Sequence, residues 1–293
     1  MPRSTSWGIP DRDIVQVSPH TFAFYAPRYP FSNSAIVVGN EGVLVFDAND
    51  VSCGRELHAA VKQYGAARPL RYLILSHPHS DHVHGAHFFA PPAKALGRAF
   101  TQERLQYWVG RDLQPFIDEA PHYAEEYRNL RIVTLEETIE AVRTLDLGEL
   151  HVRLEPVTTA HSPGDLFAVV EEDGIALCGD LLFSRCAAYI GNGSLAGSLA
   201  ALVRLRELGV SQYLPGHGPI GGIGALDGME EFLVDMQETV RAAKSVGVQD
   251  AAIVADVVRR MTPRWQHLPF FLEPWLMPDN VPIVVRELEG HTS

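Results

Sequence analysis

SHPHSDHVHG, residues 76–85, is the most informative stretch of this 293-residue chain. It places three imidazoles and one carboxylate within six positions, at His77, His79, Asp81 and His82. Zinc prefers imidazole nitrogen and carboxylate oxygen where no thiolate is offered. Side chains two residues apart in an extended segment point the same way, so we expect His77 and His79 to face one ion. Asp81 and His82 follow where the loop is expected to turn into a helix, so this second pair can face another ion.

Three further candidate ligands each follow a predicted strand. His161 lies in the turn-rich sequence TTAHSPGD, Asp180 follows the apolar strand at 175–178, and His217 lies in PGHGP. A carboxylate at the end of a buried strand is costly unless it is paired or binds a metal. These three side chains, added to residues 76–85, are enough to complete two metal sites.

The remainder of the chain alternates strand and helix patterns. Apolar and period-two runs predict strands at 14–17, 21–25, 35–38, 43–46, 70–75, 131–134, 151–157, 166–170, 175–178 and 212–214. Helical periodicity predicts helices at 55–63, from near Val83, over 101–130 with breaks at Pro115 and Pro121, and at 195–208, 229–244, 250–261 and 281–288. Two rounds of strands followed by helices are typical of an α/β sandwich with two central sheets and helices outside. We expect one domain, 1–293, with a helical insertion at 101–130 and a helical extension at 225–293.

Composition narrows the classes of partner and the compartment. The net charge is −12 and no cluster of five or more basic residues occurs, so nucleic acid is not an expected substrate. Three cysteines form no disulfide framework. The first ten residues lack the apolar core of a signal peptide, and no run of 18 apolar residues predicts a membrane span. We therefore expect a cytoplasmic protein that does not bind membranes.

The motifs together resemble the metallo-β-lactamase superfamily, in its dinuclear hydrolase branch. The resemblance also includes the hairpin at 33–47 with its strand-end Asp47, and it covers roughly three quarters of the chain. It implies an αββα sandwich and two Zn²⁺ ions, with iron or manganese as alternatives. It further implies a first ion held by His77, His79 and His161, a second ion held by Asp81, His82 and His217, and Asp180 as the bridge.

The resemblance also implies a reaction. A bridging aspartate such as Asp180 is absent from the true β-lactamases and present in thioesterase, lactonase and glyoxalase-II-like branches. We expect a metal-bridging hydroxide to cleave an acyl bond, with Asp81 and Asp180 as catalytic residues. A thioester is favoured, because the segment that begins at Asp180 loosely resembles bacterial polyketide cyclase/thioesterase members; a lactone or another ester is the alternative.

Two rival functions remain at the level of the sequence. The first is a mononuclear iron dioxygenase of the persulfide-oxidising type, although redox members with two irons usually have a glutamate where His79 stands. The second is a non-catalytic scaffold, which the complete ligand set disfavours.

Three aromatic segments are candidate walls of a substrate site. They are residues 24–31, the insertion at 101–130, which is either a lid or a helix pair packed on the core, and residues 265–277, which alternatively form a homodimer contact. We expect a small-molecule or acyl-carrier-bound substrate. The individual residues predicted to contact it are Tyr25, Tyr29, Trp108, Arg185, Tyr189 and Asn192.

Overall fold

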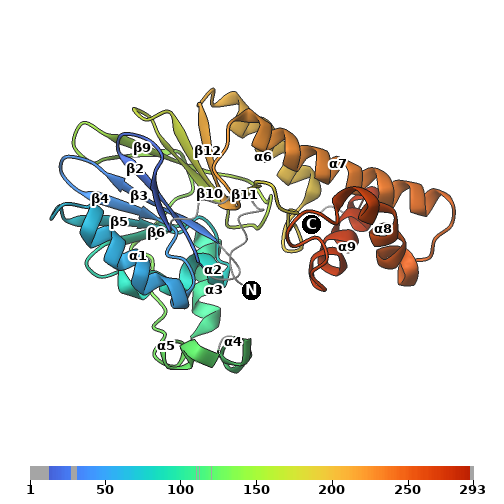
Figure 1. Cartoon of the computed structure of the whole chain (residues 1–293), viewed down its shortest axis with the longest axis horizontal. Coiled ribbons are helices and arrows are strands. Elements are labelled where there is room, and N and C mark those ends of the chain that lie inside the picture. The colour runs from blue at the N-terminus through green and yellow to red at the C-terminus, as the bar shows by residue number, and fades with distance from the viewer. Residues whose placement is uncertain (1–12, 28–31, 110, 112, 120, 291–293) are drawn as a thin grey trace.

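The computed structural model describes residues 13–27, 32–109, 111, 113–119 and 121–290. Within them, two β-sheets face each other and helices cover both outer faces (Figure 1). The first sheet contains, in spatial order, β1 (Ile14–Gln16), β2 (Thr21–Tyr25), β3 (Asn33–Val38), β4 (Val43–Phe46), β5 (Leu70–Ile74), β6 (Lys94–Gly97) and β7 (Glu137–Thr138). The second contains β12 (Gln212–His217), β11 (Ile175–Phe183), β10 (Leu166–Val170), β9 (His151–Pro156) and β8 (Arg143–Asp146).

The helices follow the strands in two groups. The first half of the chain contains α1 (Val51–Tyr64), α2 (Ser80–Val83), the 3-10 helix η2 (His84–Phe88), α3 (Ala99–Trp108), α4 (Gln114–Glu119), the 3-10 helix η3 (Pro121–Tyr123) and α5 (Ala124–Arg128). The second half contains α6 (Leu195–Glu207), α7 (Ile223–Ser245), α8 (Asp250–Trp265) and α9 (Leu276–Leu288). No helix among the described residues is both long and apolar enough to cross a membrane.

Three apolar layers hold the sandwich together. Side chains of both sheets, such as Phe46 and Leu177, form the core between them. Leu57 of α1 packs against the outer face of the first sheet. Leu202 of α6 and Met229 of α7 pack against the outer face of the second. The predicted αββα sandwich is therefore confirmed.

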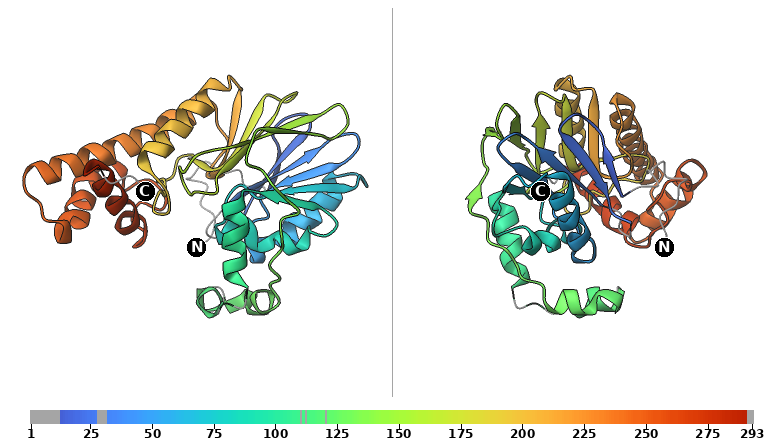
Figure 2. Two further views of the ribbon diagram at one scale, coloured as in Figure 1. Left: turned by 180° about the vertical axis from the view of Figure 1, so that it is seen from behind. Right: turned by 60° about the vertical axis from the view of Figure 1, so that its left-hand side comes forward.

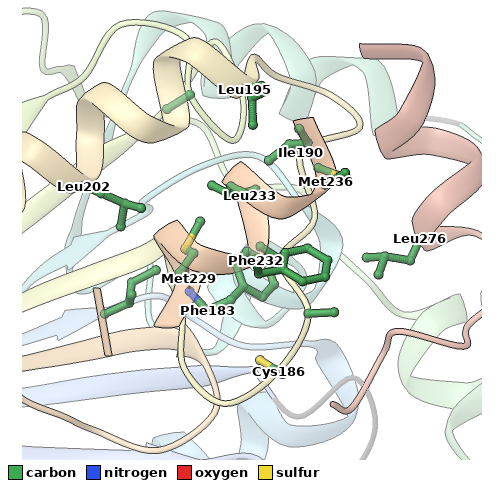
Figure 3. Close-up of a cluster of buried hydrophobic side chains, with 14 of the residues drawn as sticks. Phe183, Cys186, Ile190, Leu195, Leu202, Met229, Phe232, Leu233, Met236 and Leu276 are labelled. Carbon is green, nitrogen blue, oxygen red and sulfur yellow. Dashed lines mark hydrogen bonds between the residues drawn. The ribbon is translucent and has the colours of Figure 1, made fainter. Parts of the chain in front are cut away.

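The two helical additions project from different sheets of the sandwich. Helices α4 and α5 hang below the first sheet, and α7–α9 project from the second (Figures 1 and 2). Val51 of α1 packs with Ile117 and Tyr127 of the insertion in a small separate cluster. Figure 3 shows the C-terminal core, in which Phe232 and Leu276 pack near Phe183 of β11.

Several predicted boundaries differ from the structure. Residues 131–134 form no strand, whereas β6, β7 and β8 were not predicted, because strands of two to four residues, such as KALG, lack a periodic signal. The segment 101–130 is divided into shorter helices as predicted, and η3 begins at Pro121, but Pro115 occupies the first turn of α4, where proline is tolerated. The helix expected from near Val83 instead begins at Ser80.

Candidate metal centre

The residues of the histidine-rich stretch are placed by the end of β5. Strand β5 runs parallel to β4, so the loops that follow both strands meet at one edge of the sheet. His77 and His79 lie in the loop after β5, and Asp81 and His82 lie on α2. The change from extended loop to helix turns the second pair away from the first, as the spacing predicted.

The first group of candidate ligands comprises His77, His79, His161 and Asp180. One ligand atom from each lies within 4.8 Å of all the others. The nitrogens His161 Nε2 and His79 Nδ1 are 2.8 Å apart. His161 donates through Nδ1 to the carbonyl of Tyr189 at 2.9 Å, and His79 Nε2 donates to Oδ1 of Asn192 at 2.9 Å. Both converging nitrogens therefore present lone pairs, an arrangement that a cation between them would stabilise.

The second group comprises Asp81, His82 and His217, again with ligand atoms within 4.8 Å of one another. Oδ2 of Asp81 is 3.4 Å from Nε2 of His82 and 3.4 Å from Nε2 of His217. His217 is the last residue of β12, where the sequence predicted a loop position beyond a shorter strand.

Asp180 lies between the two groups. Its Oδ2 is 3.6 Å from His77 Nε2 and 3.3 Å from His161 Nε2, whereas its Oδ1 is 3.2 Å from His82 Nε2 and 3.5 Å from His217 Nε2. Each carboxylate oxygen thus faces one group.

Asp180 was predicted to follow a strand, but it lies within one. Strand β11 does not end before Asp180 but continues to Phe183, with a register shift against β12 at Gly179. Gly179 has a φ of 52°, a conformation that favours glycine. A Cβ on Gly216 would lie 1.9 Å from Oδ1 of Asp180, so only glycine leaves room for this carboxylate.

The buried groups of the two clusters shift one another's pKa values. Burial lowers the pKa of His161 to about 3 and lowers the pKa of His79, so both imidazoles are neutral at pH 7. Burial alone would raise the pKa of Asp180, but the charges of His217 and His82 hold it well below its usual range. Against the opposing effect of burial, Asp180 raises the pKa of His217 to about 9. Protons on imidazoles therefore balance the buried carboxylates, a role that divalent cations can take over.

The residues present fit a pair of metal ions. His77 Nε2, His82 Nε2 and Asp180 Oδ1 are buried and have no hydrogen-bond partner among the described residues. Buried polar atoms without partners are rare and call for an explanation such as an ion. Five imidazoles and two carboxylates form a donor set that suits zinc, iron or manganese.

Asp47, the residue after β4, accepts hydrogen bonds that orient the candidate ligand His82. It is 1% exposed and accepts hydrogen bonds from the backbone nitrogen and hydroxyl of Ser76, both at 2.7 Å, and from Nδ1 of His82 at 2.8 Å. Because His82 donates through Nδ1 to Asp47, Nε2 is the nitrogen that faces the second group and that would bind an ion there after losing its proton. Such carboxylate–histidine pairs fix the tautomer and orientation of a ligand.

Replacing Asp47 with asparagine is expected to weaken metal binding by about 10- to 100-fold, since the orienting carboxylate is lost. The fold is expected to persist, because asparagine also tolerates the φ of 61° at this position. A competition titration with a chromogenic chelator measures the affinity, and circular dichroism checks the fold. The matched control is Asp173→Asn, which removes the carboxylate of the Asp173–His20 pair (2.8 Å) outside the site. Equal affinities of the Asp47 variant and the wild type would contradict the assigned role.

The loop at 186–193 supports the first group and is itself held by α9. It supplies the Tyr189 carbonyl to His161 and the Asn192 side chain to His79. Asn280 of α9 is fully buried; it donates to the carbonyl of Ala188 and accepts from the backbone nitrogen of Ile190, both at 2.8 Å. The C-terminal extension therefore contributes to the position of two ligands.

A cavity of about 890 Å³ opens over both groups. Two of the predicted substrate contacts, Tyr189 and Asn192, line it. Tyr25 does not: it is 1% exposed, and its hydroxyl accepts a hydrogen bond from Ile220 at 3.3 Å. Arg185 lines a separate, smaller cavity. Tyr29 and the side chain of Trp108 lie outside the described residues.

The cavity also contains residues that sequence reasoning missed. Phe100 and Arg104 of α3, Phe183 of β11 and Asp279 of α9 line it, together with Phe116, Phe270 and Trp275 from the aromatic segments. Phe100 and Arg104 are four residues apart and so share a helix face. That spacing was the available signal, but a single such pair is too common to identify a site.

Comparisons with known proteins agree with the geometry. The sequence model of the metallo-beta-lactamase superfamily matches residues 28–217. The fold is similar to that of a metallo-beta-lactamase from Pontibacter korlensis, with a TM-score of 0.59 and 17% identity over 75% of this chain and 98% of that one. It is also similar to TMB-1 (TM-score 0.59, 15% identity, 77% of this chain and 98% of that one covered) and to the metallo-beta-lactamase DIM-1 (TM-score 0.58, 16% identity, 77% and 98% covered). No curated protein matches the sequence. At these identities the structural similarity bears on the fold alone.

Proposed function

Because the chain belongs to the metallo-beta-lactamase superfamily, we propose that it is a dinuclear metal-dependent hydrolase that cleaves an acyl bond, with a thioester as the favoured substrate. The observation that carries the proposal is the position of Asp180, whose two oxygens face the two ligand groups separately. A carboxylate placed in this way can join two ions into one reaction centre. Zinc is the proposed metal because the donors are mainly imidazoles.

The candidate ligands and Asp81 have different proposed roles in hydrolysis. Bound in these groups, two divalent ions would acidify a water molecule and polarise the carbonyl oxygen of the substrate. Asp81 faces the cavity with a side chain that is 16% exposed, whereas that of Asp180 is 4% exposed. We therefore assign to Asp81 the proton that the attacking water gives up as the C–O bond forms. When the C–S bond breaks, that proton passes to the sulfur, so the products are a carboxylic acid and a thiol.

The second group of candidate ligands favours this proposal over a mononuclear dioxygenase. Such an enzyme needs one iron, whereas Asp81, His82 and His217 supply a second complete set of donors. The bridging position of Asp180 likewise favours the thioesterase and lactonase branches over the β-lactamases.

A substrate panel tests the proposed function. Protein loaded with zinc is expected to release free thiol from simple thioesters faster than it opens lactones or β-lactams, and the rate should saturate near two ions per chain. Thiol detection with a disulfide reagent gives the rates, and elemental analysis gives the metal content in parallel. A preference for β-lactams would overturn the thioester assignment. One iron per chain with uptake of oxygen would replace a hydrolase with an oxidoreductase.

A further inference from the structure

The cavity over the metal centre is a cleft between the two helical additions. Arg104 of α3 and Phe116 of α4 line one side, and Phe270, Trp275 and Asp279 line the other. The family model ends at residue 217, so the second side comes from a part of the chain beyond it. A volume of about 890 Å³ is large enough for a ligand of drug-like size. One side of the cleft is thus formed by residues that lie beyond the shared family region.

Aromatic rings extend from the ligands into this cleft. The ring of Phe183 stacks on His217 with centroids 5.1 Å apart, and Phe270 meets the edge of His217 at 5.6 Å. Trp275 follows at 6.1 Å from Phe270 and contacts Tyr189 at 5.6 Å. Phe116 stands on the opposite wall. Flat apolar walls of this kind favour an aromatic group, because ring pairs add to the effect of area burial.

The charges in the cleft are unequal on its two sides. The guanidinium of Arg104 lies 4.7 Å from the ring centroid of Tyr107, and no described carboxylate forms an ion pair with it. On the other side, Asp279 accepts a hydrogen bond from the Tyr189 hydroxyl at 3.1 Å. An anion would therefore be attracted toward α3 and repelled from α9. Guanidinium groups bind carboxylates and phosphates in a forked geometry.

We infer that the site accepts acyl compounds in which an aromatic acyl group carries an anionic substituent. The ring lies between the Phe116 and Trp275 walls, and the anion pairs with Arg104. This inference rests on the proposed function for the reaction, but the recognition of the ring and the anion requires only the cleft.

The kinetic test uses three thioesters of one neutral thiol: acetyl, 2-naphthoyl and 6-carboxy-2-naphthoyl. We expect kcat/KM to rise in that order, and the carboxylate should raise kcat/KM about tenfold, as for a charged hydrogen bond.

Variants test the two sides of the cleft separately. Arg104→Gln should lower the ratio of kcat/KM for the carboxylated over the uncarboxylated naphthoyl ester about tenfold. Arg111→Gln is the matched control, since Arg111 also lies over Tyr107, at 3.8 Å, but does not line the cleft; its ratio should equal that of the wild type. Trp275→Leu should reduce the preference for naphthoyl over acetyl.

A binding measurement separates this inference from the proposed function. Naphthalene-2,6-dicarboxylate is expected to quench the tryptophan fluorescence of metal-free protein, with weaker binding by the Arg104 variant and not by the Arg111 variant. Hydrolysis that is equally fast for all three esters, with no effect of Arg104→Gln, would overturn the inference and leave the hydrolase in place. If no acyl compound is hydrolysed by metal-loaded protein while the dicarboxylate still binds through Arg104, the proposed reaction fails and the recognition stands. Binding that does not depend on Arg104 would refute the recognition itself.

An aromatic thioester whose only anion lies on the thiol tests which part of the substrate Arg104 recognises. If Arg104 acts on that ester instead, the anionic group belongs to the leaving group and our assignment to the acyl part is wrong.

Discussion

Asp180→Asn protein is expected to bind fewer than two metal ions per chain and to lose at least about a thousandfold in kcat/KM. The substitution keeps the shape of the side chain but removes the negative charge that faces both ligand groups. A pair of ions contributes several kcal/mol of transition-state stabilisation, which corresponds to about a thousandfold in rate. Elemental analysis and steady-state kinetics on the same preparation measure both losses.

A second variant displaces the side chain of Asp180 without substituting Asp180 itself. Gly216→Ala places a methyl group where Oδ1 of Asp180 lies, and it also meets the Gly179 carbonyl carbon at 2.8 Å. It should displace the carboxylate of Asp180 and lower the metal content although all seven candidate ligand residues are retained. An Asp180→Asn protein that retained two ions and the wild-type rate would show that Asp180 is not the bridge.

Removal of the metal is expected to lower the melting temperature by about 10 °C. A ligand present at about a thousandfold above its Kd stabilises the native state by about 4 kcal/mol. For a chain of this size, each kcal/mol shifts the melting temperature by about 2–4 °C. Differential scanning fluorimetry of chelated and zinc-loaded protein measures the shift. Magnesium serves as the control, because it prefers oxygen ligands and should not restore stability at an imidazole-rich site. Equal melting temperatures with and without zinc would contradict metal binding at the seven residues.

The candidate ligand residues could be predicted from the sequence because their signals are local. His77 to His82 are close in the chain, and Asp180 and His217 each follow an apolar run. The structure brings them together as expected, because parallel strands such as β4 and β5, or β11 and β12, end at one edge of their sheets. The continuation of β11 beyond Asp180 was not predictable, since it depends on pairing with β12 and on the backbone of Gly179.

Fewer of the residues that line the cleft could be predicted from the sequence. Aromatic residues at 270 and 275 could be named as a wall, but nothing local distinguishes Tyr25, which is buried in the core, from Trp275, which faces the cleft. Arg104 could not be identified because its role depends on what lies across the cleft. Whether residues 101–130 move as a lid stays a prediction, although Tyr127 donates to the buried carboxylate of Asp50 and so anchors α5 on α1.

The two hydrogen bonds of Asn280 carry a consequence for protein engineering. Because Asn280 holds the loop that contacts His79 and His161, the C-terminal helices contribute to the candidate metal centre, although the shared family region ends at His217. Transplanting that region alone into another scaffold would carry all seven candidate ligands but leave two of them without support. A chimera that aims to change the substrate should therefore exchange the Phe270–Trp275 wall while leaving Asn280 and its loop as a matched pair.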